Sequence, residues 1–508
     1  MERKWWSLLA VCLATFMLLL DITVVNVALP DIQKDLNASL SSLQWVVDAY
    51  SLTLAAFLLT AGSLADRVGR RRVFTFGFAI FTVASFLCGI SGNATLLNLA
   101  RGLQGVGGAA MFATSLALIA QEFQGRERGT AIGAWGATIG GAVAVGPLIG
   151  GAPTQGLGWE WIFFVNVPIG IGAIVLTTTQ LANVAAPDPE PIDWPGLFTF
   201  SLGLFGLIFG LIRGNPDGWS SAPIVGSLGA AVVLLVAFIV IELRRENAML
   251  DLSLFRKPAF AGVSIVAMAL SAGMFALFLY ITLYMQDVLG YSPLETGVRF
   301  LPLTLVSFFV APVAGRLSAR IPVRALLGVG LALVGTGLVL QHGVTLGDTW
   351  TTLLAGFVLQ GVGIGMVNPG IASTAIGVVA PARAGMASGV NNTFRQVGIA
   401  TGVAALGAIF QSAIASKLSE LAPQAPSSFA DAVSAGSAQS AIQAAPPGVR
   451  AQLTTAANQA FIQGFNDILL IGAIIAFTGA VLGFALVRSR DFVTQPEGQP
   501  AAAEPAAA

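Results

Sequence analysis

The 508-residue sequence is poor in charge, in cysteine and in histidine. Charged residues make up 10% of the chain and hydrophobic residues 55%, with a mean hydropathy of +0.81. A soluble domain needs roughly 25% charged residues to cover its surface, so we expect lipid to be the solvent. Cys12 and Cys88 lie in apolar runs and give no disulfide framework, and a single histidine, His342, excludes a histidine-rich site. We therefore expect neither a metal nor a cofactor.

Other features are missing too, and each absence argues against a class of protein. The 25 basic and 25 acidic residues balance, so we expect no nucleic-acid partner held by bulk charge. The pattern Gly-x-x-x-x-Gly-Lys-Ser/Thr is absent, so we expect no nucleotide partner. A membrane-embedded enzyme would need a constellation such as two histidines with a carboxylate, so we expect no enzyme. No cleavable signal peptide is evident, because the apolar run 5–29 is long enough to span a membrane.

Apolar stretches of about 20 residues predict an all-α polytopic membrane protein with fourteen spanning helices. The predicted spans are 6–29, 44–64, 73–91, 95–117, 130–152, 160–181, 194–212, 222–243, 259–283, 294–314, 324–341, 350–372, 387–411 and 465–487. With a cytoplasmic N-terminus, most basic residues fall in cytoplasmic segments, as the positive-inside rule requires. We therefore expect a multi-pass protein of the cell (plasma or inner) membrane with both termini in the cytoplasm.

An internal repeat divides the predicted helices into two halves. Residues 103–107, Leu-Gln-Gly-Val-Gly, recur at 359–363, and the spaced pattern Gly-x-Ala-x-Gly at 129–133 recurs at 385–389. Parallel repeats around a central site are typical of secondary transporters. The predicted domains are an N-terminal six-helix bundle (1–182), two inserted helices with linkers (183–257), a C-terminal six-helix bundle (258–490) with an external loop (412–463), and a disordered cytoplasmic tail (491–508).

Four motifs of the first half carry a family resemblance. They are Gly62-Ser-Leu-Ala-Asp66-Arg67-Val-Gly69-Arg70-Arg71-Arg72, Arg101-Gly-Leu-Gln104-Gly105, Gly146-Pro147-Leu-Ile-Gly150-Gly151 and Leu20-Asp21-Ile-Thr23-Val-Val-Asn26. Together they resemble the major facilitator superfamily, and the last pattern resembles its fourteen-helix drug:proton antiporter branch. The resemblance implies two six-helix bundles plus two inserted helices, alternating access and proton-driven export. Ala142 replaces the usual first glycine of the third motif.

The basic motif after the second span is predicted to gate the transporter. Its gating residues are Gly62, Asp66, Arg67, Gly69, Arg70 and Arg71. The Asp66 carboxylate can pair with Arg67 or Arg70, or cap the N-terminus of a helix in the other half. Such contacts would exist in one transport state only, and the resemblance implies this latch role. The alternative is that the arginines only fix the topology. Ala319, the repeat counterpart of Asp66, has no carboxylate, so any latch is one-sided.

Three charged residues inside or near spans are candidates for proton coupling: Asp21, Asp48 and Arg101. A charge at membrane depth costs about 2.5–3.5 kcal/mol on insertion scales, so we expect Arg101 to face inward and pair with an acidic group. The alternative is that it reaches the membrane surface. Asp21 lies deep in the first span and is the best proton carrier; alternatively it only bonds neighbours such as Thr23 and Asn26.

The predicted substrate contacts are Asp21, Asn26, Asp48 and Tyr50, although Asp48 lies near the outer surface, where a solvated role is a strong alternative. The antiporter motif comprises Gly146, Pro147, Gly150 and Gly151. Pro147 is expected to bend its helix, and the glycines provide a smooth seam between the halves. The alternative is close packing without a transport role.

The predicted function is proton-coupled efflux of amphipathic drugs or antibiotics by alternating access. The expected partners are protons, an amphipathic small molecule and the lipid bilayer. Lipophilic cations suit the acidic side chains, but compounds of other charge remain open. Uptake or facilitated diffusion of a small solute is the alternative. A membrane receptor or sensor without transport is a third reading, against which the absence of a sizeable soluble domain counts.

Overall fold

A computed structural model describes residues 2–38, 40–156, 158–181, 191–318 and 320–493, and the regular structure in these ranges is entirely helical. The α-helices are α1 (Arg3–Asp35), α2 (Leu40–Val68), α3 (Arg70–Gly89), α4 (Ala94–Glu122), α5 (Gly125–Gly156), α6 (Trp161–Phe164), α7 (Asn166–Gln180), α8 (Trp194–Asp217), α9 (Ala222–Arg244), α10 (Pro258–Leu270), α11 (Ala276–Leu283), α12 (Pro293–Arg299), α13 (Leu301–Leu317), α14 (Val323–Gln341), α15 (Leu354–Gly377), α16 (Ala384–Leu421), α17 (Ser427–Ser434), α18 (Ala438–Ala444) and α19 (Arg450–Leu486). The predicted all-α class is confirmed.

The helices are long and apolar enough for a polytopic membrane protein. Twelve segments among the described residues meet the length and hydropathy of a membrane span. Helix α13, of 17 residues, is a shorter apolar helix, and α5 extends over 32 residues. These two helices occupy the remaining positions of the predicted series. A count of fourteen is compatible with this arrangement and stays a prediction.

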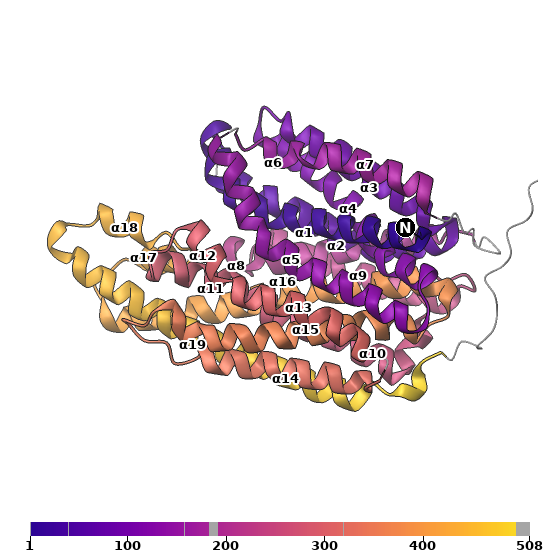
Figure 1. Ribbon diagram of the computed structural model, residues 1–508. Helices are drawn as coiled ribbons and strands as arrows, with labels where there is room; N and C mark the ends of the chain where they lie inside the picture. The colour runs from indigo at the N-terminus through magenta and orange to yellow at the C-terminus, as the bar shows by residue number, and fades with distance from the viewer. Residues whose placement is uncertain (1, 39, 157, 182–190, 319, 494–508) are drawn as a thin grey trace, which may run out of the picture.

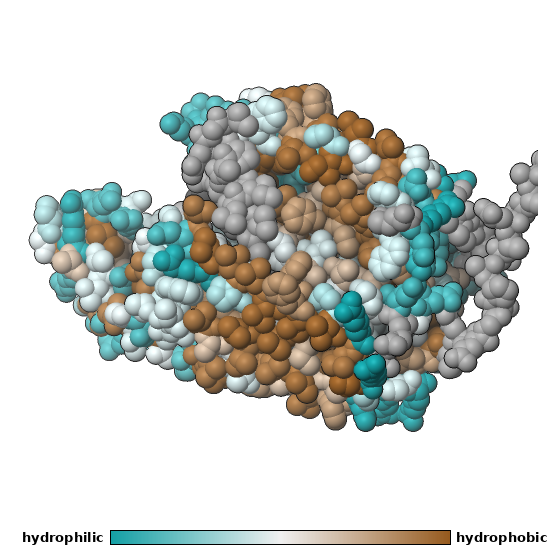
Figure 2. Space-filling model, in the orientation of Figure 1, coloured by the Kyte–Doolittle hydropathy of each residue, from teal (hydrophilic) through white to brown (hydrophobic). Residues whose placement is uncertain are grey.

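Apolar side chains cover the middle of the molecule on the face seen in Figure 2. Figure 2 shows hydrophobic residues over the central part of the visible face and hydrophilic residues at both ends. Large apolar side chains on α9, such as Val233 and Leu243, are exposed. Because helices satisfy their backbone hydrogen bonds internally, such a surface suits hydrocarbon. The chain is therefore a multi-pass membrane protein.

Equivalent helix pairs in the two halves reproduce the sequence repeat. Gln104 of α4 donates to the Ser85 hydroxyl of α3 at 2.8 Å, and Gln360 of α15 donates to Gln341 of α14 at 2.8 Å. Both members of the second pair lie 256 positions after those of the first (360 − 104 and 341 − 85). Glycine allows both helix pairs to approach closely. The repeat is thus structural as well as sequential.

The two halves meet along two repeat-related glycine seams. On one seam, Gly62 of α2 lies against Gly385 of α16; on the other, Gly129 of α5 lies against Gly315 of α13. A Cβ atom at any of these positions would overlap the opposing backbone. Figure 1 shows the halves close together at the end where the N-terminus lies and diverging toward the end that carries α6, α17 and α18. We call the first end the basic end, because the arginine-rich turn 67–72 lies there.

The inserted helices α8 and α9 form a hairpin beside the α2–α16 seam. Thr60 of α2 and Ser201 of α8 share a hydrogen bond of 2.9 Å, and Asn215 of α8 donates to the Ala404 carbonyl of α16 at 2.8 Å. Helix α9 packs against α8 and exposes its other side. The hairpin therefore contacts both halves and belongs to neither repeat unit.

Some elements differ from the predicted outline. The sixth span is divided at Val165 into α6 and α7, and the predicted external loop 412–463 is largely helical. Its ends extend α16 to Leu421 and begin α19 at Arg450, with α17 and α18 between them. Alanine-rich sequence favours helix, which explains why this polar segment is folded. The predicted disordered tail lies outside the described residues beyond position 493.

Candidate functional site

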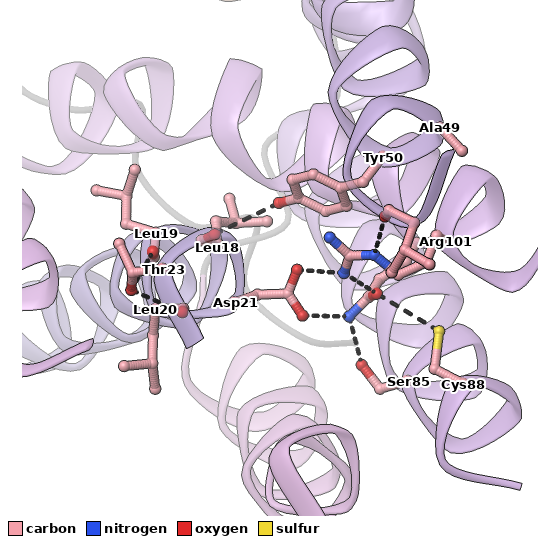
Figure 3. Close-up of polar contacts among 12 residues, drawn as sticks. Leu18, Leu19, Leu20, Asp21, Thr23, Ala49, Tyr50, Ser85, Cys88 and Arg101 are labelled. Carbon is pink, nitrogen blue, oxygen red and sulfur yellow. Dashed lines mark hydrogen bonds and ion pairs between the residues drawn. The ribbon is translucent and has the colours of Figure 1, made fainter. Parts of the chain in front are cut away.

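A closed network of polar side chains lies inside the first half, between α1 and α4 (Figure 3). Arg101 donates from one Nη atom to Asp21 at 2.5 Å and to the Gln104 side-chain oxygen at 2.7 Å. Gln104 in turn donates to the second Asp21 oxygen at 2.9 Å. Arg101 is 1% and Asp21 5% exposed. The structure therefore brings Asp21 and Arg101 together as a buried, hydrogen-bonded ion pair.

Neighbouring groups complete the surroundings of the Arg101 guanidinium. Its Nε atom donates to the Val46 carbonyl at 2.9 Å, and its central carbon lies 4.4 Å from the centre of the buried Tyr50 ring. The ring of Phe163 lies 5.7 Å away on another helix. A cation over an aromatic face is stabilised electrostatically. The Tyr50 ring thus covers one face of the Arg101 guanidinium.

The two charges of this network, Asp21 and Arg101, stabilise each other, so a change in one charge affects the other. Removing one partner of a buried ion pair costs about 3–5 kcal/mol, since the other charge is left uncompensated. A proton on Asp21 has the same electrostatic consequence as losing the carboxylate. Protonation would therefore release Arg101 from its strongest partner. The geometry suits a proton-dependent change in the packing of α1 against α4.

Thr23, which the sequence offered as an alternative bonding partner of Asp21, does not bond to it in the structure. The Thr23 hydroxyl donates to the carbonyls of Leu19 and Leu20 in its own helix, as threonine commonly does. Its side chain also faces Gly146 of α5, where a Cβ would overlap it. The partners of Asp21 are Arg101 and Gln104 instead. The other predicted neighbour lies outside the described side chains.

Four members of the predicted site cannot be placed. They lie outside the described side chains, although α1 runs through Asn26 and α5 runs through Pro147, Gly150 and Gly151. Gly146 is buried. The antiporter motif therefore contributes one described position, at which α5 approaches α1.

Asp48 belongs to a second cluster, apart from Asp21. Its carboxylate lies 3.8 Å from Arg213 of α8, which also donates to Asp217 at 2.7 Å and to Gln44 at 2.7 Å. The predicted span 194–212 ended before Arg213 and left it in an outer loop. Helix α8 continues to Asp217 and buries this arginine against α2. In the sequence, Arg213 directly follows the outer end of a predicted span, and Asp48 lies near the outer end of another. These two opposite charges are the signal that could have identified the contact.

The gating motif holds the two halves together at the basic end. Asp66 accepts from the backbone N–H groups of Gly385 at 3.0 Å and Met386 at 2.8 Å, the first turn of α16. It also accepts from Arg70 at 2.9 Å, while Arg70 donates to the carbonyl of Pro381. A carboxylate at a helix N-terminus is stabilised by the free N–H groups and the helix dipole. Both predicted contacts of Asp66 are therefore present together, with Arg70 as the pairing arginine.

The other arginines of the motif bind backbone carbonyls. Arg67 donates to the carbonyls of Asn247 at 3.1 Å and Ala248 at 2.9 Å in the linker after α9. Arg71 donates to the Leu181 carbonyl at 3.2 Å. Gly69 has a φ of 112°, a conformation that favours glycine, and makes the turn between α2 and α3. These contacts tie α2 and α3 to both neighbouring linkers.

A further ion pair at the same end was not predicted. Asp251, at the start of the short helix before α10, accepts from Arg383 at 2.6 Å, just ahead of α16. Partial burial raises the pKa of Asp251, but hydrogen bonds from Ser253 and the Arg383 guanidinium outweigh it and hold that pKa below its ordinary value. The Asp251 pair therefore ties the segment before α10 to the segment before α16.

Fold and site together describe a multi-pass membrane transporter built from two related halves. The family model of the Major Facilitator Superfamily matches residues 11–403. The chain belongs to the major facilitator superfamily.

Named relatives cover most of the chain. The tetracenomycin C resistance and export protein of Streptomyces glaucescens is 34% identical over 99% of this chain and 95% of its own length. The puromycin resistance protein of Streptomyces alboniger is 37% identical over 82% of this chain and 84% of its own. The human organic anion transporter MFSD10 has a TM-score of 0.60 at 14% identity, covering 94% of this chain and 100% of its own, and shows the fold alone.

Proposed function

We propose that this protein exports amphipathic drugs or antibiotics across the cell membrane in exchange for protons, by alternating access. Relatives that match over most of their length are resistance and export proteins, which supports export as the direction of transport. The observation that carries proton exchange is the buried network of Asp21, Arg101 and Gln104. A carboxylate without access to water, paired with one cation, is suited to bind a proton in one state only.

The proposed cycle assigns a role to each member of the network. Asp21 takes a proton from outside, which weakens its bond to Arg101 and loosens α1 against α4. The change in packing turns the substrate site, between the halves, from one side of the membrane to the other. Release of the proton inside restores the ion pair. Asp21 is therefore the proton carrier and Arg101 the group that ties its charge to the arrangement of the helices.

The proposed orientation puts the basic end in the cytoplasm, with both termini there. The arginines of segment 67–72 support this through the positive-inside rule. In this orientation the described arrangement is closed toward the cytoplasm. The Asp66 contact with α16 must then break before substrate enters from inside, which makes Asp66 the latch.

Facilitated diffusion without protons is the second candidate, and one experiment separates the two. Purified protein is reconstituted in vesicles, a pH gradient with an acidic lumen is imposed, and accumulation of the fluorescent cation ethidium and of the fluorescent anion anilinonaphthalene sulfonate is followed. Proton exchange predicts accumulation of at least one dye against its gradient in the wild-type protein and in the control Asp431→Asn, whose acid is exposed on α17. Dye movement that ignores the pH gradient would reject the antiport proposal.

A further inference from the structure

One face of α16 buries a row of polar side chains. Ser388, Asn391, Asn392 and Arg395 follow the spacing i, i+3, i+4 and i+7, so they project from the same side of the helix. Each of them is at most 7% exposed. A spanning helix that buries four such residues in one row departs from the apolar packing seen elsewhere in this bundle.

Most polar atoms of this row have no hydrogen-bond partner among the described residues. They include Ser388 Oγ, the side-chain nitrogen of Asn391, both polar atoms of Asn392 and Arg395 Nε. The bond that Arg395 makes is to the Asn368 side-chain oxygen of α15, at 2.9 Å. A buried polar atom left without a partner costs about 1–3 kcal/mol. Such a concentration of unused donors indicates that the row meets a partner during the transport cycle.

Arg395 also lacks a balancing charge. No carboxylate forms an ion pair with it in the described part of the chain. A guanidinium carries five N–H donors and no acceptor. Burial of a cation without a counter-ion is costly in a membrane protein. The partner that best suits this position is negatively charged.

The polar row lies where the two halves meet. On α16, Gly385 and Gly389 contact α2 of the first half. On α15, Pro369, the residue after Asn368, contacts Gly136 of α5. Asn368 therefore lies next to the contact of α15 with α5, and Arg395 lies on the helix whose first turns contact α2. This is the region that opens and closes when the halves move.

We propose that Ser388, Asn391, Asn392 and Arg395 bind the anionic group of the exported compound, such as a carboxylate, a sulfonate or an ionised phenol. The inference rests on the proposed export function and names its substrate class. It also chooses between the substrate charges that the sequence leaves open, because Asp21, which would suit a lipophilic cation, is already neutralised by Arg101. Arg395 supplies the charge, and the amides and the hydroxyl orient the oxygen atoms.

Binding to the purified protein tests the site without any transport. The two probes are anilinonaphthalene sulfonate, a permanently charged aromatic anion, and ethidium, a permanently charged aromatic cation. Saturable quenching of tryptophan fluorescence is measured for the wild type, Arg395→Gln and Arg395→Lys. We expect Arg395→Gln to lower affinity for the anion about tenfold to a hundredfold, because hydrogen bonds to charged groups are strong. Arg395→Lys keeps the charge and should lose less.

The control Arg450→Gln removes an exposed arginine at the first residue of α19 and should bind the anion like the wild type. The inference is overturned if Arg395→Gln binds the anion as tightly as the wild type. It is equally overturned if the variant loses both dyes to the same extent, because that result indicates a structural role for Arg395.

A second variant separates ligand binding from folding. Asn392 has no partner at either polar atom, so Asn392→Leu removes two unsatisfied groups from a buried position. Replacing such groups by an apolar side chain is neutral or stabilising for the fold. We therefore expect an unchanged or higher unfolding temperature together with weaker anion binding. A lower unfolding temperature with normal anion affinity would contradict the inference.

The charge moved per cycle gives a readout in vesicles. Exchange of one proton for a monovalent anion moves two positive charges in the direction of the proton, whereas exchange for a monovalent cation moves none. A lumen-positive potential, set with potassium and valinomycin, should therefore accelerate accumulation of the anionic dye. If the anion binds through Arg395 and neither dye responds to the pH gradient, the proton exchange fails and the anion site stands. Gradient-driven transport of ethidium that Arg395→Gln leaves unchanged, without anion binding, supports export and rejects the anion site.

Discussion

Two of the buried arginines, Arg101 and Arg395, differ in how their charge is balanced. Arg101 lies against the Asp21 carboxylate, the Gln104 side chain and the Tyr50 ring. Arg395, equally deep in the second half, bonds to the neutral amide of Asn368. A compensated charge is part of the protein's own structure, whereas an uncompensated one is open to a ligand. This difference is the basis on which we propose proton coupling in the first half and substrate recognition in the second.

The repeat explains why these functions need not lie at equivalent places. The counterpart of Arg101 is Phe357, which is buried and packs against Phe300 at 5.4 Å between ring centres. The glutamine of the Arg101 motif, Gln104, is kept in the second half as Gln360. Gln360 donates to Gln341 instead of to a carboxylate. The helix-packing positions are therefore shared, and the charged positions are not.

Removal of Arg101 should cost much more stability than removal of Arg395, and this is the largest difference we expect. Arg101→Gln leaves Asp21 buried without a counter-ion and should cost about 3–5 kcal/mol. Arg395→Gln removes an unpaired charge and should change stability by about 1 kcal/mol or less, or stabilise the fold. Thermal unfolding followed by tryptophan fluorescence checks both.

The double variant Asp21→Asn with Arg101→Gln provides the control for this comparison. Because it removes both charges, it should be more stable than Arg101→Gln alone. Equal destabilisation by the two single arginine variants would show that Arg395 is compensated as Arg101 is, and would remove the basis of the comparison.

Asp21→Asn should abolish proton-driven transport, and it should cost about 3–5 kcal/mol of stability because Arg101 loses its counter-ion. The amide keeps the shape of the carboxylate, and Arg101 retains Gln104 and the Val46 carbonyl. Dye accumulation against its gradient should fall to the level of empty vesicles, while dye movement down its gradient continues. Vesicle transport with and without a pH gradient measures this, and accumulation at the wild-type rate would remove Asp21 as the proton carrier.

Much of the first site can be predicted from the sequence because a charge in a span must find a partner inside the protein. That argument brings Asp21 and Arg101 together without any structure. It does not identify Gln104 as the second partner, because Thr23 is nearer to Asp21 in sequence. Only the direction of the side chain, toward α4 and away from the Thr23 side of α1, decides between them.

The second site was harder to predict for two reasons. Arg395 stands inside a predicted span, but its neutral partner Asn368 lies on another helix and no repeat motif links the two. The row of Ser388, Asn391, Asn392 and Arg395 is visible as a helical period, but its lack of partners depends on packing. The count of apolar residues ended the predicted span at 212 and left Arg213 outside it. The last turn of α8 is hydrophilic, but it remains helical and packs against α2.

The latch can be compared with a capping carboxylate elsewhere in the chain. Asp66→Ala removes the acceptor for two N–H groups of α16 and the partner of Arg70, which should weaken the closed arrangement by about 1–2 kcal/mol. Turnover should slow more than substrate affinity falls. Glu295→Ala removes the capping carboxylate of α12 at the other end and is the matched control. Equal transport rates for Asp66→Ala and the control would exclude the latch.

The smallest effect is expected at Asp48, whose charge is balanced to an intermediate degree. Arg213 lies 3.8 Å from Asp48 but is held more closely by Asp217 at 2.7 Å, and Asp217, unlike the buried Arg213, remains exposed to water. Arg213→Gln should therefore cost about 1 kcal/mol or less and slow transport without abolishing it. The same vesicle assay measures the change, with Lys417→Gln, which removes a half-buried ion pair with Glu420 outside this cluster, as the control. Loss of transport as complete as in Asp21→Asn would mean that α8 carries part of the proton pathway, and the coupling machinery would then extend beyond the first repeat.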